Sequence, residues 1–324
     1  MKALRQLFDE YQQNHPFSNY NPKELYEPID YILSLGGKRI RPVLALMACQ
    51  LFSEDVKAAL PAAYAVEIFH NFSLVHDDIM DESPLRRGQA TVHKKYSTNT
   101  AILSGDVMLV YAYEYISKVP SHLLAAILPI FNEVAIGVCE GQQMDINFEE
   151  QTDVTIPEYV RMIELKTSVL LYGAMKIGAL IGGASEAEAE LIGEFGRNMG
   201  IAFQMQDDYL DTFGKQAKVG KRIGGDIVQN KKTYLVIKAL ELADEATEKE
   251  LRTLLSSSPP AEEEDAKIKR VTDIFMDLGI PNEMKKIMRQ YSDKALDCLN
   301  QLQLTSIQRE PLEAFLAMLM QREH

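Results

Sequence analysis

Apolar residues recur at intervals of three to four positions along most of this 324-residue chain, and the strict alternation typical of strands is nearly absent. The helical pattern is clearest over residues 62–80, 157–175 and 192–210. Each of these stretches is longer than a usual strand and long enough for several turns of helix. The hydrophobic pattern therefore predicts an all-α protein.

Glycine and proline residues divide this pattern into separate elements. Gly36-Gly37 is expected to end one helix, and Pro42 lies near the start of the next. Residues 83–88 are expected to form a loop directly after the first long helix. The polar stretch 256–265 contains two prolines, but helical patterning resumes at once, so it is expected to be a surface loop. We therefore expect a single domain over residues 1–324.

Composition and charge exclude several classes of protein. The net charge is −13, and the basic residues are concentrated in short clusters, which argues against a nucleic-acid partner because phosphate backbones require broad basic surfaces. Polar residues interrupt the longest apolar stretches, and the N-terminal segment lacks the apolar core of a signal peptide, so no stable membrane insertion is expected. Three scattered cysteines, with the spacing of neither a zinc site nor a disulfide framework, favour a cytoplasmic protein: Cys49, Cys139 and Cys298.

One acidic signature, Asp-Asp-x-x-Asp, occurs twice within the helical stretches, and the two copies begin 130 residues apart at Asp77 and Asp207. Residues four apart in a helix lie about 40° apart around its axis and about 6 Å along it. The first and last carboxylates of each copy therefore face the same side and can hold one cation or a small metal cluster. The candidate metal ligands are Asp77, Asp78, Asp81, Asp207, Asp208 and Asp211.

Basic residues close to the acidic copies indicate what else is bound. Arg86 and Arg87 follow the first copy within a turn and a loop, and lysines follow the second. Mg²⁺ prefers one or two carboxylates together with phosphate oxygens over a cage made by protein alone. Arginine adds planar, permanently charged donors for phosphate. A solvated acidic helix end beside a basic loop would explain one copy, but the second copy favours a polyphosphate site that also binds Mg²⁺.

Four sequence elements, in this order along the chain, together resemble the trans-isoprenyl diphosphate synthase family. They are Gly36–Pro42 (GGKRIRP), the Asp77 motif followed by Arg86-Arg87-Gly88, Lys166-Thr167, and Phe203–Asp211 (FQMQDDYLD). The resemblance extends over nearly the whole chain through the helical patterns on either side. It implies a single-domain isoprenoid synthase fold, which is a class I terpenoid synthase-like helical bundle around a central cavity.

The resemblance also implies a head-to-tail prenyl transfer. The diphosphate of a dimethylallyl, geranyl or farnesyl primer departs, the double bond of isopentenyl diphosphate attacks the resulting carbocation, and proton loss gives an allylic diphosphate one C5 unit longer. The implied cofactor is Mg²⁺, several ions with three expected once substrate is bound, acting as Lewis acids where charge develops on the leaving diphosphate. The family is usually homodimeric, so a homodimer is expected.

Residue roles follow from matching this chain to the family motifs. The implied catalytic residues are Asp77, Asp81, Lys166, Thr167, Gln204 and Asp207, of which Thr167 and Gln204 stabilise the carbocation through oxygen atoms. The implied cationic contacts of the allylic diphosphate are Arg86, Lys166, Lys221 and Lys231. The implied pocket for isopentenyl diphosphate consists of Lys38, Arg41, His70 and Arg87. His70 has independent support, because it precedes Asp77 by seven residues and so shares nearly the same helix face.

Product length depends on the residues just before the first acidic copy. In the family, the fifth and fourth residues before the motif often form the floor of the product pocket, and here they are Phe72 and Ser73. One aromatic residue, a small neighbour and no insertion in the motif resemble enzymes making geranylgeranyl diphosphate (C20), while farnesyl diphosphate (C15) remains open. An ideal helix places Phe72 nearly opposite the aspartates, so a floor role requires an irregular turn, and Phe69 can share it.

Three other functions fit parts of the sequence. A class I terpene cyclase has acidic motifs and an all-α core, but its second metal motif usually differs from Asp-Asp-x-x-Asp. A non-catalytic regulatory subunit of a heteromeric prenyl synthase typically has degraded motifs, whereas both copies are intact here. A structural calcium-binding protein is disfavoured because neither copy has the glycine-containing loop of an EF-hand. The prenyl synthase interpretation is therefore preferred.

Overall fold

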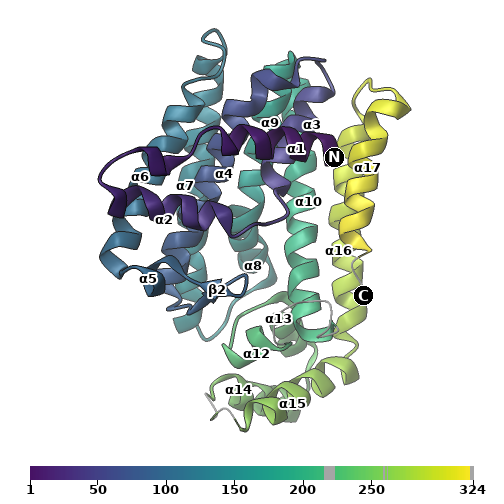
Figure 1. The fold of residues 1–324 in the computed structure, drawn as a ribbon. Coiled ribbons are helices and arrows are strands. Elements are labelled where there is room, and N and C mark those ends of the chain that lie inside the picture. The colour runs from purple at the N-terminus through teal and green to yellow at the C-terminus, as the bar shows by residue number, and fades with distance from the viewer. Residues whose placement is uncertain (215–222, 258–259, 261, 322–324) are drawn as a thin grey trace. The chain divides into compact units, whose positions relative to one another are not determined.

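The computed structural model describes residues 1–214, 223–257, 260 and 262–321, and Figure 1 shows that these residues are almost entirely helical. The described residues contain only two strands, β1 (Leu85–Arg86) and β2 (Gln89–Ala90), which pair antiparallel as a hairpin. The all-α class predicted from the hydrophobic pattern is confirmed.

The helices follow one another with short connections. Those before residue 151 are α1 (Lys2–Gln13), α2 (Lys23–Ser34), α3 (Ile40–Gln50), α4 (Leu60–Met80), α5 (Val92–Lys95), α6 (Thr98–Ile116) and α7 (Leu124–Glu150), with the short 3₁₀ segments η1 (Phe17–Asn19) and η2 (Val56–Ala59). Those after it are α8 (Ile156–Ile163), the π-helical η3 (Glu164–Ser168), α9 (Val169–Gly182), α10 (Glu186–Phe213), α12 (Gly225–Val228), α13 (Tyr234–Leu242), α14 (Glu245–Leu255), α15 (Glu264–Asp277), α16 (Ile280–Asn300) and α17 (Ser306–Met320).

The chain forms two compact units, each with its own core. Unit 1 consists of Met1–Val138, Leu170–Glu194 and Leu302–Arg309, and unit 2 consists of Cys139–Val169, Phe195–Gln301 and Glu310–His324. The chain passes from one unit to the other inside α7, α9, α10 and α17, so the sequence does not divide into two consecutive domains. The single domain expected over residues 1–324 stays a prediction.

Helix α4 forms the centre of unit 1, because its apolar residues occur on nearly every side and are buried by α3 and α6. Glycines permit the close approach of neighbouring helices. A Cβ atom on Gly105 of α6 would lie 2.2 Å from Nε2 of His76 on α4, and one on Gly178 of α9 would lie 2.1 Å from the carbonyl oxygen of Ala45 on α3. A larger residue at Gly178 would push against the backbone of α3, and one at Gly105 would displace the ring of His76. The first acidic copy occupies the last turn of α4.

Unit 2 buries a cluster of large side chains contributed by α8, α13, α15 and α16. Tyr159, Phe275, Ile280 and Met284 are almost fully buried in this cluster. The C-terminal part of α10, residues 195–213, belongs to the same unit and carries the second acidic copy. The second copy therefore begins from a well-packed helix, with Ile201 in the core three residues before Gln204 and Met205 in the core two residues before Asp207.

Two of the three predicted long helices are confirmed, since residues 62–80 lie within α4 and residues 192–210 within α10. The third prediction, for residues 157–175, was wrong in one detail, because η3 interrupts the α-helix with a π-helical turn. The predicted loop at 83–88 also contains strand β1, which pairs with β2. Helix α2 ends at Ser34 and Gly36 adopts a φ of 79°, so the glycine pair follows the helix as expected.

Two helical stretches are long and apolar enough to cross a membrane by length and composition, Leu124–Glu150 and Ile156–Gly182. In the second, 78% of the most apolar window is buried inside the protein, as in the core helix of a soluble protein. In the first, only 33% is buried. Two such helices are weak grounds for membrane insertion, and its absence stays a prediction.

Candidate active site

The first acidic copy lies where α4 ends. The N–H group of Asp81 donates to the carbonyl oxygen of Asp77 at 2.9 Å, and Glu82 then takes a φ of 49°, which stops the helix. Asp77 is partly exposed, with 19% of its side-chain surface accessible, and Asp81 is exposed. Asp78 is 1% exposed. The helix therefore divides the motif into two accessible carboxylates, one turn apart, and one buried carboxylate between them.

The β1–β2 hairpin brings Arg86 back to the buried carboxylate. Arg87 and Gly88 occupy its two-residue turn with φ values of 53° and 76°, the left-handed conformation that such tight turns require. Arg86 then donates from Nε and a terminal nitrogen to the two oxygens of Asp78, each at 2.7 Å. The same guanidinium lies 3.7 Å from Asp77. Arg86 thus binds Asp78 and Asp77, and its predicted contact with diphosphate stays a prediction.

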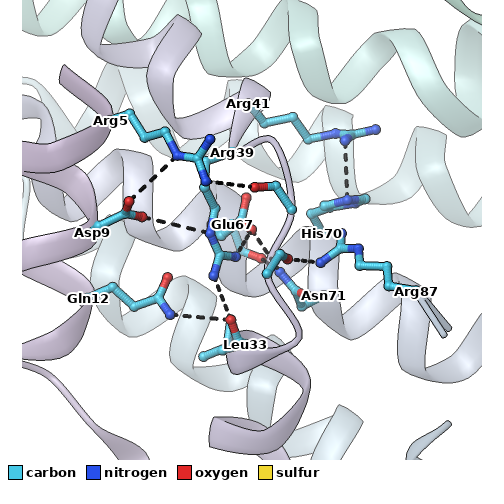
Figure 2. A network of polar contacts seen from close by, with 12 residues as sticks. Arg5, Asp9, Gln12, Leu33, Arg39, Arg41, Glu67, His70, Asn71 and Arg87 are labelled. Carbon is cyan, nitrogen blue, oxygen red and sulfur yellow. Dashed lines mark hydrogen bonds and ion pairs between the residues drawn. The ribbon is translucent and has the colours of Figure 1, made fainter. Parts of the chain in front are cut away.

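A second group of cations surrounds His70 in the middle of α4. A terminal nitrogen of Arg41 lies 3.2 Å from Nε2 of His70. Arg87 donates to the carbonyl oxygen of Gly36, and a Cβ on Gly37 would come within 2.9 Å of its guanidinium, so a larger residue there would displace that guanidinium. Figure 2 shows Arg41, His70 and Arg87 close together. Lys38 is exposed in the turn that follows Gly37.

His70 is neutral in this arrangement. Arginine can only donate, so Nε2 must accept and the proton must be on Nδ1. Burial, followed by the charges of Arg41, Arg87, Arg86 and Arg39, lowers the pKa of His70 well below its usual value. The structure therefore brings together three of the four residues predicted for the isopentenyl diphosphate pocket, around a neutral imidazole.

The predicted floor residues lie on the part of α4 that precedes the motif. Phe72 is 8% exposed, and its ring packs 5.4 Å from that of Phe69 and 4.9 Å from that of His76, measured between ring centroids. Ser73 is only partly buried and donates to the carbonyl oxygen of His70 at 2.8 Å. Helix α4 is continuous through these positions, so the irregular turn expected for a floor at Phe72 does not occur. The assignment of Phe72, Ser73 and Phe69 as the floor stays a prediction.

The second acidic copy also has a buried middle carboxylate. Asp208 is 7% exposed, and it accepts from the hydroxyl of Tyr159 at 2.6 Å and from the amide of Gln204 at 3.0 Å. The hydroxyl of Thr167 donates in turn to the amide oxygen of Gln204 at 3.2 Å. Burial, with a smaller contribution from the charge of Asp226, raises the pKa of Asp208 to about 8. A positive ion bound nearby would favour the charged carboxylate instead.

The flanking carboxylates of this copy are more open. Asp207 and Asp211 are partly exposed. Asp211 accepts from the backbone N–H of Asp226 at 2.9 Å, and its own carbonyl oxygen accepts from the N–H of Gly224 at 2.6 Å. These bonds tie the segment that follows α10 back to the acidic motif. Lys221, predicted to contact diphosphate, lies outside the described residues.

The π-helical turn η3 presents the predicted Lys166 and Thr167 to the same region of unit 2. Gly141 on α7 permits this, because a Cβ there would lie 2.3 Å from the backbone nitrogen of Lys166. The ammonium of Lys166 lies 2.6 Å from a carboxylate oxygen of Asp145. π-Helical turns of this kind often occur at functional sites, because they reorient side chains relative to the α-helical register.

Unit 2 contains a cavity of about 110 Å³. Most of the residues predicted to act together with the second acidic copy line it. Among its lining residues are Lys166, Thr167, Gln204, Asp208 and Lys231, together with Asp145, Tyr159 and Asp226, which the sequence did not predict. Nothing in the spacing of the last three indicates a site, since they occur singly and reach the cavity only through the fold. A solitary aspartate after Gly224-Gly225 was the one available signal for Asp226.

The donor set suits Mg²⁺ held together with phosphate oxygens. Among the described residues, no three side chains of His, Cys, Asp or Glu converge to form a metal site made by protein alone. Mg²⁺ usually keeps several waters and binds one or two carboxylates plus substrate phosphates. Asp77 with Asp81, and Asp207 with Asp211, each supply two accessible carboxylates one helical turn apart. The residues present therefore fit an ion that binds with its substrate.

Comparisons with known proteins agree with this chemistry. A family model described as polyprenyl synthetase matches residues 22–274. A geranylgeranyl diphosphate synthase of Methanosarcina mazei is 44% identical over 222 residues, which are 68% of this chain and 68% of that protein. A short chain isoprenyl diphosphate synthase of Methanothermobacter thermautotrophicus is 36% identical over 308 residues, 95% of this chain and 93% of that protein.

A solved structure has the same fold over the whole chain. The crystal structure of a geranylgeranyl pyrophosphate synthase superposes with a TM-score of 0.95 at 42% identity, covering 100% of this chain and 99% of that one. The predicted isoprenoid synthase fold is therefore confirmed.

Proposed function

The chain belongs to the polyprenyl synthetase family and is a short-chain trans-prenyltransferase, and we propose that its two acidic motifs bind Mg²⁺ and the diphosphate of an allylic primer. One observation carries the proposal. In both motifs the middle aspartate, Asp78 or Asp208, is buried and hydrogen-bonded within the protein, while the first and last aspartates are more accessible. The second substrate is isopentenyl diphosphate.

Within the first motif, Asp77 and Asp81 are the direct ligands in this proposal. Asp78 holds Arg86 through two hydrogen bonds, and the same guanidinium lies close to Asp77. Arg86 therefore fixes the orientation of the motif and keeps a positive charge beside it. Mg²⁺, when bound, supplies the Lewis acid that stabilises charge on the departing diphosphate.

The second motif positions the groups that face the reacting carbon in this proposal. Asp207 and Asp211 are the direct ligands, and Asp208 orients Gln204 through the amide hydrogen bond. Because the Gln204 amide donates to Asp208, its oxygen is held where it accepts from Thr167. Thr167 and Gln204 both line the cavity with Lys166, and their oxygen atoms can stabilise a carbocation electrostatically.

The cations of unit 2 bind phosphate oxygens of the allylic primer. Lys166 and Lys231 both line the cavity. Lys166 lies against Asp145, which keeps the ammonium in place before substrate enters. The proposal includes Lys221 by its position in the family motif.

Lys38, Arg41, His70 and Arg87 bind isopentenyl diphosphate in this proposal. The support is the convergence of Arg41 and Arg87 on His70, whose neutral ring adds a hydrogen-bonding group without further positive charge. A pocket whose charged side chains are cations suits a diphosphate that must be held without being ionised.

The proposed product is geranylgeranyl diphosphate, with farnesyl diphosphate as the alternative. Support comes from the single aromatic residue Phe72 with small Ser73 beside it, and from relatives whose names state geranylgeranyl diphosphate synthesis. Phe72 packs with Phe69, so the two rings can close the pocket together.

We propose that the protein is a cytoplasmic homodimer. Leu103 and Val110, one heptad apart on α6, are 58% and 64% exposed, and Ile136 on α7 is 59% exposed. Each would lose contact with water in an interface between two copies.

The test combines the purified chain, Mg²⁺, isopentenyl diphosphate and either dimethylallyl, geranyl or farnesyl diphosphate. Release of pyrophosphate with linear products of defined chain length is the expected result, and chelation of Mg²⁺ is expected to abolish it. Cyclic products would instead indicate a terpene cyclase. Absence of turnover with every primer would indicate a regulatory subunit.

A further inference from the structure

One cation of the turn between α2 and α3 does not face the proposed isopentenyl diphosphate pocket. Arg39 is 8% exposed, between exposed Lys38 and the pocket residue Arg41. Its guanidinium donates to a carboxylate oxygen of Glu67 and to the carbonyl oxygen of Leu33, each at 2.5 Å. Figure 2 shows this group beside Arg41, His70 and Arg87, and directed away from them. Arg39 therefore joins the end of α2 to the middle of α4.

The turn that carries these cations has an unusual backbone. Gly36, Gly37 and Arg39 have φ values of 79°, 136° and 51°. A left-handed conformation costs a residue other than glycine on the order of 1 kcal/mol and persists only where surrounding contacts impose it. The carbonyl oxygen of Arg39 accepts from the N–H of Val43, so this residue sets the direction in which α3, and with it Arg41, begins.

Glu67 accepts one of the two hydrogen bonds that the Arg39 guanidinium donates. It is 3% exposed on α4, one turn before His70. Asn71 donates from its amide to the same carboxylate oxygen at 3.1 Å and to the carbonyl oxygen of Glu67 at 2.8 Å. Asn71 and Arg39 therefore both donate to the same carboxylate oxygen of Glu67.

The charge of Glu67 also reaches the pocket. Burial lowers the pKa of Arg87, and the negative charge of Glu67 opposes that change. Glu67 is thus the buried anion beside a group of cations that would otherwise repel one another. Removing it would alter both the shape of the turn and the electrostatic balance of the pocket.

We propose that Glu67, acting through Arg39, is a positioning residue for the isopentenyl diphosphate pocket. It holds the turn at residues 36–39 in the shape that brings Lys38, Arg41 and Arg87 to one substrate. This inference rests on the proposed function of those three residues. A purely structural ion pair is the competing interpretation, because breaking a buried pair also destabilises a protein.

Steady-state kinetics of Glu67→Gln separate the two interpretations, because glutamine keeps the size of the side chain and removes its charge. The Michaelis constant for isopentenyl diphosphate is expected to rise about tenfold or more, as when hydrogen bonds to a charged group are lost, while that for the allylic primer stays within about twofold. The matched control is Glu190→Gln, which removes a different carboxylate of unit 1, one that pairs with Lys176. It is expected to leave both constants unchanged.

A fall in thermal stability with both constants unchanged would overturn the inference and leave a structural ion pair. Should Glu67→Gln not fold by circular dichroism, the double variant Arg39→Gln, Glu67→Gln removes both charges together and is judged by the same criterion. Lys38→Ala and Arg41→Ala test the pocket itself. If these raise the constant for isopentenyl diphosphate and the Glu67 variants do not, the inference alone fails. If Lys38→Ala and Arg41→Ala leave the constant for isopentenyl diphosphate unchanged, the assignment of the pocket and the inference both fail.

Discussion

Arg86 donates two hydrogen bonds of 2.7 Å to the carboxylate of Asp78. The sequence had predicted Asp78 to bind metal and Arg86 to bind diphosphate. Asp78 is 1% exposed, so its negative charge is compensated almost entirely by this one guanidinium. The pair fixes the hairpin onto the end of α4. It also separates the carboxylates of the motif by function, since Asp77 and Asp81 remain accessible.

That separation predicts different effects for two asparagine substitutions. Asp78→Asn is expected to lower the stability of the protein by about 2 kcal/mol, because Arg86 loses a charged partner while remaining largely buried. Asp77→Asn is expected to lower the turnover number at least about a hundredfold and to raise the Mg²⁺ concentration needed for half-maximal rate, because it removes a ligand whose contact acts in the transition state. Thermal melts and Mg²⁺ titrations measure the two effects. Equal Mg²⁺ requirements in both variants would contradict this assignment.

Replacement of Phe72 by alanine is expected to yield longer products than the parent enzyme. The aromatic ring fills space beside Phe69, and its removal leaves a cavity into which a growing chain can extend. Product chromatography after exhaustive incubation measures the change. Phe8→Ala is the control, because it removes another buried ring of unit 1, one that packs against Tyr64 instead. Unchanged chain length with Phe72→Ala would remove Phe72 from the floor of the pocket.

His70 is expected to make the folded protein less stable as the solution becomes acidic. Its pKa is lowered in the folded protein, so below about pH 6.5 the unfolded chain binds a proton there that the folded chain does not. The free energy of unfolding contributed by this residue therefore falls with decreasing pH, by at most about 1.4 kcal/mol per pH unit. Burial is the largest cause of the lowered pKa, and the charges of Arg41, Arg87, Arg86 and Arg39 add to it.

The difference between parent and His70→Gln isolates that contribution. Glutamine offers an amide oxygen that can accept from Arg41, but it does not titrate. Thermal melts from pH 5 to pH 8 are expected to show the two melting temperatures diverge below about pH 6.5, with the parent losing more. Parallel curves would indicate that the folded imidazole takes up its proton normally.

Lys267 is expected to hold the proposed phosphate contact Lys231 in place. Lys267 is 4% exposed, and its ammonium donates to the side-chain oxygen of Asn230 at 2.5 Å and to the carbonyl oxygen of Ser257 at 2.9 Å. Asn230 has a φ of 59°, a strained conformation that these bonds support immediately before Lys231.

Substitution Lys267→Met removes both hydrogen bonds and keeps the apolar part of the side chain. We expect a loss of about 2 kcal/mol in stability and a higher Michaelis constant for the allylic primer. Lys238→Met is the control, since that lysine pairs with Glu241 on the exposed face of α13. A parental Michaelis constant in a folded Lys267→Met variant would show that the turn at Asn230 holds its shape without the lysine.

The chain's helical class could be predicted from the sequence, because periodicity is local and the residues of one helix turn are neighbours in sequence. For this reason residues 62–80 and 192–210, which were predicted to be helical, do lie within α4 and α10. The π-helical turn η3 could not be predicted, because it depends on the close approach of α7 at Gly141, more than twenty residues earlier in the sequence. Local residues alone favour an uninterrupted α-helix there.

The amino-acid sequence alone establishes which residues carry charge and how the two acidic motifs are spaced. These two facts were enough to predict a site that binds Mg²⁺ and a diphosphate. Which of these charged side chains bind other residues of the protein, and which face the proposed substrates, depends on the tertiary structure. Arg39 and Arg41 are both arginines of one turn, yet one is buried against Glu67 and the other lies against His70. Burial makes an unpaired charge costly, so buried Arg39 pairs with the anion that the fold places beside it. That partner is distant in sequence, and no local pattern identifies it.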